Sequence, residues 1–315
     1  MTHVNTVLGP VDQDDLGIVA VHEALLSVFP GAQYAPDITF DRPEIFSTLE
    51  ARLKDFASHG GGTIVDATGM FHGRDLPLLE ALSRATGVHI VASTGQGPEG
   101  LLGGYFLTPQ TNPPTPWPAE KFAELFEAEV TEGMVIPRVE RRAPAGLIVT
   151  AVTREGRTAT DESLLRGAAR AAAVTGAPLS FQYGNDALGD LDVVLSEGLD
   201  PSRILIGGAD RVDAPVLEIA ARGVYVGIDN IGTSDDELVD DDARARLIRD
   251  LIEAGHTDRI IVSASAIGVA KGLPGRDVAY SAPLAFVRDL GFDETTTDAF
   301  LRDNPRAFLS LSETT

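Results

Sequence analysis

Cysteine is absent from this 315-residue chain, which excludes disulfides, thiolate zinc sites, iron–sulfur clusters and cysteine nucleophiles. Basic residues are scarce as well: 25 Lys and Arg stand against 47 Asp and Glu, for a formal net charge of -22. Nucleic acids and anionic membranes are bound through basic surfaces, and the sequence assembles no basic stripe. We therefore expect neither nucleic acid nor a membrane as a partner.

Long hydrophobic runs are missing too. No apolar stretch approaches the roughly 20 residues needed to cross a bilayer. The segment MTHVNTVLGPVDQDD at the start is polar and acidic, and it lacks the basic and apolar regions of a signal peptide. These absences predict a cytoplasmic protein. A hydrophobic fraction of 43% beside 23% charged residues is typical of a globular chain with a sizeable core.

Short, β-branched apolar runs recur along the chain, separated by amphipathic helical patterns. Near-continuous apolar runs are typical of parallel strands that are covered on both faces. Eight such strands predict an α/β fold, a closed (β/α)8 TIM barrel, and the lack of a linker predicts one domain over residues 1–315. An open doubly wound sheet is the alternative, although no G-x-G-x-x-G fingerprint follows the first strand. The predicted strands are residues 16–21, 63–67, 88–94, 146–150, 178–182, 203–207, 224–228 and 259–263.

The position of each histidine relative to these strands indicates which end of the barrel it can reach. Active sites of such barrels lie at the C-terminal ends of the strands. His22 directly follows the first predicted strand and His72 lies in the loop after the second, so both can reach the mouth. His59, His89 and His256 precede or open strands, which places them at the opposite, structural end.

Several segments, in order along the chain, carry a resemblance to a known family. They are LGIVAVHEALL, IVDATGMFHGRDLPLLEALSRATGVHIVASTG, AGLIVTAV, ESLLRGAARAAAVTGAPLSFQYG, SEGLDPSRILIGGAD, ARGVYVGIDNIG and AGHTDRIIVSAS. Nearly the whole chain thereby resembles the phosphotriesterase-like family of the amidohydrolase superfamily. The resemblance implies a metal-dependent-hydrolase type of (β/α)8 barrel that acts on phosphotriesters, lactones and related esters.

The resemblance also implies two divalent metals held by six side chains at the strand ends. Transferred position by position, the first of the six is present as His22. The other five positions hold Ala24, Val149, Gln182, Gly208 and Ser265. No Lys, Asp or Glu occurs in residues 145–152, and no histidine lies between His89 and His256, so shifting the alignment restores nothing. Because one imidazole cannot hold zinc, we predict no metal, no cofactor and no metal-activated hydroxide.

Three polar residues at the predicted strand ends are the catalytic candidates: His22, Ser265 and Asp229. His22 is either a general base or ligand contact, or a histidine satisfied by its neighbours. Ser265, like Ser263, could form a Ser–His pair with His22, because strands one and eight adjoin in a closed barrel. Such a pair needs a third, orienting carboxylate, which the sequence alone does not identify.

Two acidic residues follow the sixth and seventh predicted strands. Asp210 and Asp229 match acidic positions that lie beside the metals in the family. Without metals, we expect these carboxylates either to pair with Arg211 or Arg74, or to bind a cationic or hydroxylated ligand.

Two further segments have predicted structural roles. Strand alternation directs Glu23 away from His22 and towards the helices. In the HGRD segment, Asp75 is expected to cap the following helix.

Residues 97–118 form a long loop with several apolar side chains, which predicts either a lid over the mouth or an interface. Those side chains are Leu101, Leu102, Tyr105, Phe106, Leu107 and Trp117.

The substitutions predict a largely neutral pocket in place of a charged metal centre. Its predicted residues are His22, Ala24, Val149, Gln182, Gly208, Asp210, Asp229 and Ser265. We interpret the chain as a pseudoenzyme that acts as a small-molecule binder or as a partner subunit in a homo- or hetero-oligomer, for example with an active relative. The alternative is a metal-independent or weakly metal-dependent hydrolase of an ester, lactone or phosphotriester.

Overall fold

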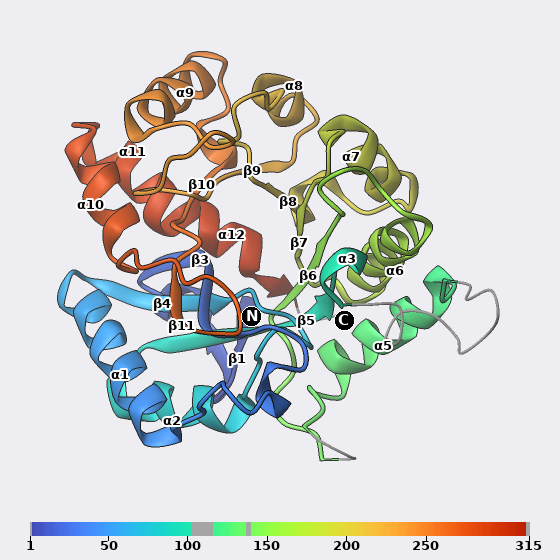
Figure 1. Ribbon diagram of the computed structural model, residues 1–315. Coiled ribbons are helices and arrows are strands. Elements are labelled where there is room, and N and C mark those ends of the chain that lie inside the picture. The colour runs from blue at the N-terminus through green and yellow to red at the C-terminus, as the bar shows by residue number, and fades with distance from the viewer. Residues whose placement is uncertain (1, 103–115, 137–139, 313–315) are drawn as a thin grey trace.

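A computed structural model describes residues 2–102, 116–136 and 140–312, and its central feature is a closed barrel of parallel strands (Figure 1). Each strand pairs in parallel with the next in chain order. After the last of them, β11 (Ile267–Lys271) pairs in parallel with β3, so the chain that follows β10 returns to the first strand of the ring. The predicted (β/α)8 fold is confirmed. The barrel strands are β3 (Ile18–Val28), β4 (Gly61–Asp66), β5 (His89–Gln96), β6 (Leu147–Ala151), β7 (Leu179–Gln182), β8 (Ile204–Gly207), β9 (Tyr225–Ile228) and β10 (Ile260–Val262).

Helices surround this ring and bury the outer faces of the strands (Figure 1). They are α1 (Arg42–Ser58), α2 (Leu76–Thr86), α3 (Glu99–Leu102), α5 (Ala119–Thr131), α6 (Ala159–Thr175), α7 (Ala187–Ser196), α8 (Val216–Ala220), α9 (Asp241–Glu253), α10 (Ala282–Asp289), α11 (Glu294–Asp298), a π-helical segment (Ala299–Asp303) and α12 (Asn304–Leu309). Short 3-10 helices cover Gln13–Asp15, Ala32–Tyr34, Pro201–Arg203 and Thr257–Arg259. None of the helices in the described part of the chain is both long and apolar enough to cross a membrane.

The helix boundaries follow local capping signals in the sequence. Asp75 accepts a hydrogen bond from the backbone N–H of Leu78, so it caps α2 as predicted. Thr158 and Asp161 form a reciprocal capping box at the start of α6. Left-handed Gly87 and Gly176 end α2 and α6, where a residue with a Cβ would be strained. These boundaries depend on neighbouring residues alone.

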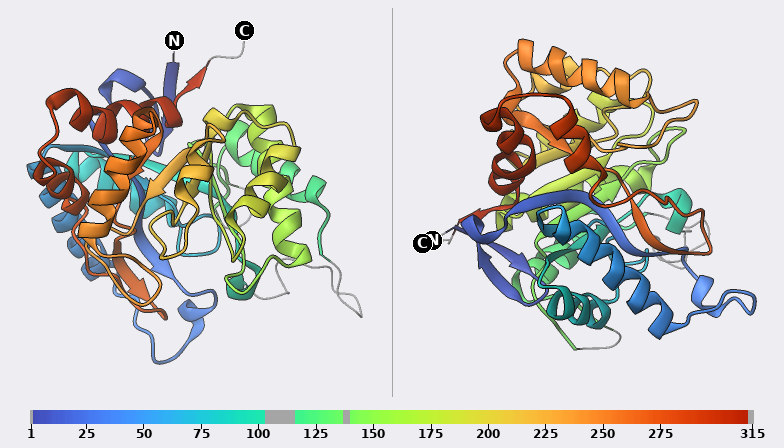
Figure 2. Two further views of the ribbon diagram at one scale, coloured as in Figure 1. Left: turned by 90° about the horizontal axis from the view of Figure 1, so that it is seen from above. Right: turned by 90° about the vertical axis from the view of Figure 1, so that its left-hand side faces the viewer.

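The N-terminal segment forms an element that the sequence analysis did not assign. Strands β1 (Thr2–Thr6) and β2 (Gly9–Asp12) form an antiparallel hairpin, and β12 (Leu311–Ser312) pairs with β1. Val4 from this hairpin joins Phe308 and Leu309 in the core that fills the barrel interior. Figure 2 shows β1 (blue) and β12 (red) close together at one end of the molecule. The hairpin thus helps to fill the barrel at the end opposite the mouth.

Strand β3 is longer than predicted, and this changes the position of His22. The prediction ended the strand at residue 21, whereas β3 continues to Val28. Pairing with β11 extends it, with Ile267 opposite Ala24 and Val269 opposite Leu26. The register against β4 shifts between Ala20 and Glu23, as at a β-bulge. His22 therefore lies inside a strand at an irregular position, not in a loop.

Candidate active site

A cavity of about 280 Å³ opens at the C-terminal ends of the strands. Its wall is partly apolar, with Ala67, Val149, Ala151, Pro98, Leu101 and Ile267. Its polar lining includes His22, Ser27, Thr68, His72, Gln182 and Ser265. None of the described residues that line it is a lysine or an arginine. The cavity therefore offers hydrogen-bonding groups without a fixed positive charge.

Five of the eight predicted pocket residues line this cavity: His22, Ala24, Val149, Gln182 and Ser265. The other three, Gly208, Asp210 and Asp229, do not, and for them the prediction needs correction. Both aspartates are buried and hydrogen-bonded inside the protein, as described below. Asp229 supports the cavity wall from behind, because it contacts the lining residues His22, Gln182 and Ser265.

The three catalytic candidates come together in the structure. His22 Nδ1 lies 3.2 Å from Ser265 Oγ and 3.4 Å from Asp229 Oδ2. The backbone N–H of His22 also donates to Ser263 Oγ at 3.1 Å. In a Ser–His–Asp triad the serine and the carboxylate contact opposite ring nitrogens. Here both contact Nδ1, so this cluster is not a triad of that kind.

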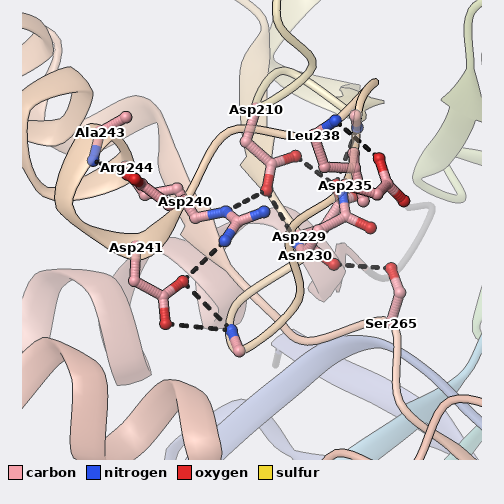
Figure 3. Close-up of polar contacts among 12 residues, drawn as sticks. Asp210, Asp229, Asn230, Asp235, Leu238, Asp240, Asp241, Ala243, Arg244 and Ser265 are labelled. Carbon is pink, nitrogen blue, oxygen red and sulfur yellow. Dashed lines mark hydrogen bonds and ion pairs between the residues drawn. The ribbon is translucent and has the colours of Figure 1, made fainter.

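Ser265 is held in an unusual conformation. Its φ of 47° lies in the left-handed region, where residues other than glycine are uncommon. Its hydroxyl donates to the backbone carbonyl of Asp229 at 2.6 Å, a contact visible in Figure 3. Strain of this kind persists only where surrounding contacts over-determine it. The hydroxyl proton is therefore directed away from His22.

Asp229 is satisfied by neutral donors. Its Oδ1 accepts from the backbone N–H of Gly208 at 2.8 Å, and its Oδ2 accepts from Gln182 Nε2 at 3.0 Å. Burial raises the pKa of Asp229 and the nearby charge of Asp210 adds to the rise, while the Gly208 and Gln182 donors oppose it. The amide and the backbone N–H thus supply the hydrogen bonds that this buried carboxyl needs.

Burial favours the neutral form of both mouth histidines. Burial, followed by the charge of Arg276, lowers the pKa of His22 from 6.5 to about 4. Burial also lowers the pKa of His72, although its hydrogen bond to Gly97 opposes the change. Neutral imidazoles keep a lone pair on one ring nitrogen.

Asp210 forms a buried ion pair that differs from the predicted one. It accepts from Arg244 Nε at 2.7 Å, and both side chains are 0% exposed (Figure 3). Asn230 donates to the same carboxylate through its backbone and its amide. Arg244 Nη1 also donates to Asp241 at 2.7 Å. The predicted partners, Arg211 and Arg74, are engaged elsewhere.

Arg74 and Arg211 have other structural roles. Arg74 forms a bidentate ion pair with Glu129 at 2.6 and 2.9 Å. Arg211 stacks over the ring of Tyr183 at 4.1 Å and donates to the carbonyls of Tyr183 and Gly184. The sequence did contain a signal for Arg244: it shares a helical stripe with Ile248 and Leu251, both buried in α9. A lone arginine on a buried stripe indicates a buried anionic partner.

Glu23, in β3, connects the first strand of the barrel to the chain segment that follows the last strand, β10. Its carboxylate accepts from the backbone N–H groups of Ala264 at 2.9 Å and Ala266 at 2.6 Å. Its role is structural, as expected, but its partners lie after β10 and not on a helix. Burial raises the pKa of Glu23 from 4.5 to about 8 against the effect of these two hydrogen bonds.

The residues present do not fit a two-metal centre. Ala24 and Val149 carry no metal-binding atom, and Gly208 carries no side chain. A Cβ at Gly208 would lie 2.9 Å from both Arg211 Nε and Gln182 Oε1, so the space beside it is filled. Across residues 2–102, 116–136 and 140–312, no three His, Asp or Glu side chains form a group that could hold a metal ion. No step of the chemistry can therefore be assigned to a metal here.

Most of the long loop predicted as a lid or interface, including Tyr105, Phe106 and Leu107, lies outside the described residues. Within them, Leu101 lines the cavity. Trp117 packs on Phe122 of α5 with ring centroids 5.7 Å apart, so it belongs to the packing of that helix.

Comparison with known proteins finds relatives of this chain that include named hydrolases. The chain is 29% identical to the phosphotriesterase homology protein of Mycobacterium tuberculosis, over 97% of each chain. It is 28% identical to an aryldialkylphosphatase of Saccharolobus solfataricus, over 95% of this chain and 97% of that protein. It is also 23% identical to an N-acetyltaurine hydrolase of Salmo salar, over 98% of this chain and 97% of that protein.

Solved structures agree with the sequence comparisons. A mutant of the organophosphorus hydrolase from Deinococcus radiodurans superposes with a TM-score of 0.82 and 26% identity, over 97% of each chain. The sequence profile of the phosphotriesterase family matches residues 2–309. This match covers nearly the entire chain, and the chain therefore belongs to the phosphotriesterase family.

Proposed function

We propose that this chain is a metal-independent member of its family whose mouth cavity binds a small, uncharged organic molecule. The observation that carries the proposal is the cavity itself. A space of about 280 Å³ persists at the strand ends, although five of the six metal-ligand positions hold residues other than the family's ligands. Small-molecule sites are typically concave and mostly apolar, with a few placed polar groups. This cavity has that composition.

The charges of the site favour an uncharged ligand. His22 is neutral at pH 7, and the lining contains no lysine or arginine to attract an anion. The oxygens of Asp229 and of Glu23 are occupied by hydrogen bonds inside the protein. Burying an unpaired charge in such a place is costly. A neutral molecule avoids that cost.

Two measurements test this proposal. After dialysis against a chelator, protein offered zinc, cobalt or manganese should retain far less than one equivalent by elemental analysis. Saturation-transfer NMR should detect uncharged probes of the cavity, namely cyclohexanol, cyclohexanone and δ-valerolactone. Val149→Trp fills the cavity and should abolish the signal, whereas Val174→Trp, at an exposed position of α6, is the control. A stoichiometric pair of metals, or binding that survives Val149→Trp, would refute the proposal.

A second candidate is metal-independent hydrolysis, which the contact between His22 Nδ1 and Ser265 Oγ favours. The hydroxyl proton of Ser265 is given to a backbone carbonyl, so this serine is not activated by His22 in the described arrangement. We therefore expect no turnover of phosphotriesters, aryl esters or lactones above background. Metal-independent turnover that disappears in both His22→Ala and Ser265→Ala would establish the second candidate.

A further inference from the structure

The hydrogen bonds of His22 determine which of its ring nitrogens carries the proton. Ser265 Oγ has one proton, and it donates that proton to the carbonyl of Asp229. Towards His22 the hydroxyl can therefore act only as an acceptor, so His22 Nδ1 must donate. A neutral imidazole carries one ring proton, so with that proton on Nδ1 the lone pair lies on Nε2. No described residue forms a hydrogen bond with Nε2, and His22 lines the cavity.

The same argument gives the opposite tautomer for His72. Its Nε2 lies 3.2 Å from the backbone carbonyl of Gly97. A carbonyl only accepts, so Nε2 carries the proton and Nδ1 carries the lone pair. No described residue pairs with Nδ1, and His72 also lines the cavity.

A third acceptor comes from Gln182. Its amide nitrogen faces Asp229 Oδ2 at 3.0 Å, which orients the side chain. Its Oε1 is therefore the free end, and Gln182 lines the same cavity. Among the described residues, none donates a hydrogen bond to this oxygen. Ser27, buried and in the lining, adds a hydroxyl with no partner among the described residues.

Resting on the function proposed above, we propose that the ligand is a small uncharged alcohol or diol whose hydroxyl groups donate to these acceptors. The acceptors are His22 Nε2, His72 Nδ1 and Gln182 Oε1. A hydroxyl group can in turn accept from Ser27, or from the amide nitrogen of Gln96 and the hydroxyl of Ser180, which line the same cavity with no partner among the described residues. The apolar wall around Val149 and Ile267 suits the hydrocarbon part of such a molecule. Anions and molecules that only accept hydrogen bonds leave the three lone pairs unmatched.

A matched set of small molecules tests the ligand class by calorimetry on the full chain. The probes are cyclohexanediol, its dimethyl ether, the corresponding diketone, cyclohexanecarboxylate and cyclohexylammonium. The diol should bind at least about tenfold more tightly than the ether or the diketone, since a net hydrogen bond is worth about fivefold in affinity. Equal or tighter binding of the ether, the diketone, the carboxylate or the ammonium overturns this inference but leaves the binding cavity in place. If none of the probes binds, the function proposed above fails as well.

Two variants remove one acceptor each while keeping the contact that orients the side chain. His22→Asn retains an N–H for Ser265, and His72→Gln retains one for the carbonyl of Gly97. Each should weaken diol binding about fivefold and leave ether binding unchanged. His59→Asn, at the exposed end of α1, is the matched control. An equal loss for diol and ether would mean a structural effect and would overturn the assignment.

The tautomers can be tested without any ligand. Long-range proton–nitrogen NMR spectra at neutral pH should show His22 protonated at Nδ1 and His72 protonated at Nε2. On addition of the diol, the resonances of His22 Nε2 and His72 Nδ1 should move. Protonation of His22 at Nε2 in the free protein would contradict the inference directly.

Discussion

The ion pair between Arg244 and Asp210 offers the sharpest test of how the site is held together. Both side chains are 0% exposed and their closest atoms are 2.7 Å apart. Removing one partner of such a pair leaves an uncompensated buried charge, at a typical cost of about 3–5 kcal/mol. Arg244→Met deletes the guanidinium but keeps much of its volume. We expect it to destabilise the protein by about 3–5 kcal/mol, a large fraction of an ordinary domain stability.

Further substitutions measure how much each charged residue around this ion pair contributes to the stability of the protein. Asp241 is 43% exposed and also contacts Arg244, so Asp241→Asn should cost at most about 1 kcal/mol. The double variant Asp210→Asn/Arg244→Met removes both charges. Its loss of unfolding free energy should be roughly 1–3 kcal/mol smaller than the sum of the losses in the two single variants. Urea unfolding followed by circular dichroism measures the wild type, the three single variants and the double variant. A cost below about 1 kcal/mol for Arg244→Met, or strict additivity, would refute the argument.

Further predictions concern the other groups around the mouth. The pKa of Glu23 is raised from 4.5 to about 8, so the folded state binds the proton more tightly than the unfolded state does. The free energy of unfolding should therefore fall as the pH rises between these two values. Urea midpoints measured across this pH range should show the fall, and Glu23→Gln should reduce it. An unchanged slope in that variant would assign the pH dependence to another group. The Ser265→Gly variant should be about 1 kcal/mol more stable than the Ser265→Ala variant. Both lack the hydroxyl, but only glycine adopts a φ of 47° without strain. Equal thermal stability of the two variants would contradict this. Gly208→His should not restore metal binding, because Arg211 fills the space beside it, and one equivalent of zinc by elemental analysis would show otherwise. Self-association stays a prediction of the sequence, and light scattering that finds a monomer across micromolar concentrations would contradict it.

Local patterns in the sequence were enough to predict the barrel, which the structure confirms, whereas the absence of a metal centre stays a prediction. Apolar runs and helix caps such as Asp75 depend on neighbouring residues, so the eight units could be recognised one by one. The missing ligands were equally local, because Ala24 and Val149 carry no metal-binding group in any conformation. A chemical group that is absent from a side chain cannot be supplied by folding.

Only the tertiary structure decided which polar groups pair. Asp210 and Arg244 are 34 residues apart, and Glu23 bonds a backbone N–H 241 residues further along the chain. The same holds for β3, whose pairing with β11 extends the strand from Ala24 to Val28. Periodicity describes which face of an element is buried, but hydrogen bonds between distant strands and helices depend on how those elements meet. The tautomers of the two mouth histidines are set by such distant bonds, to Ser265 and to the carbonyl of Gly97, and so the acceptor-lined cavity emerges only in the folded barrel.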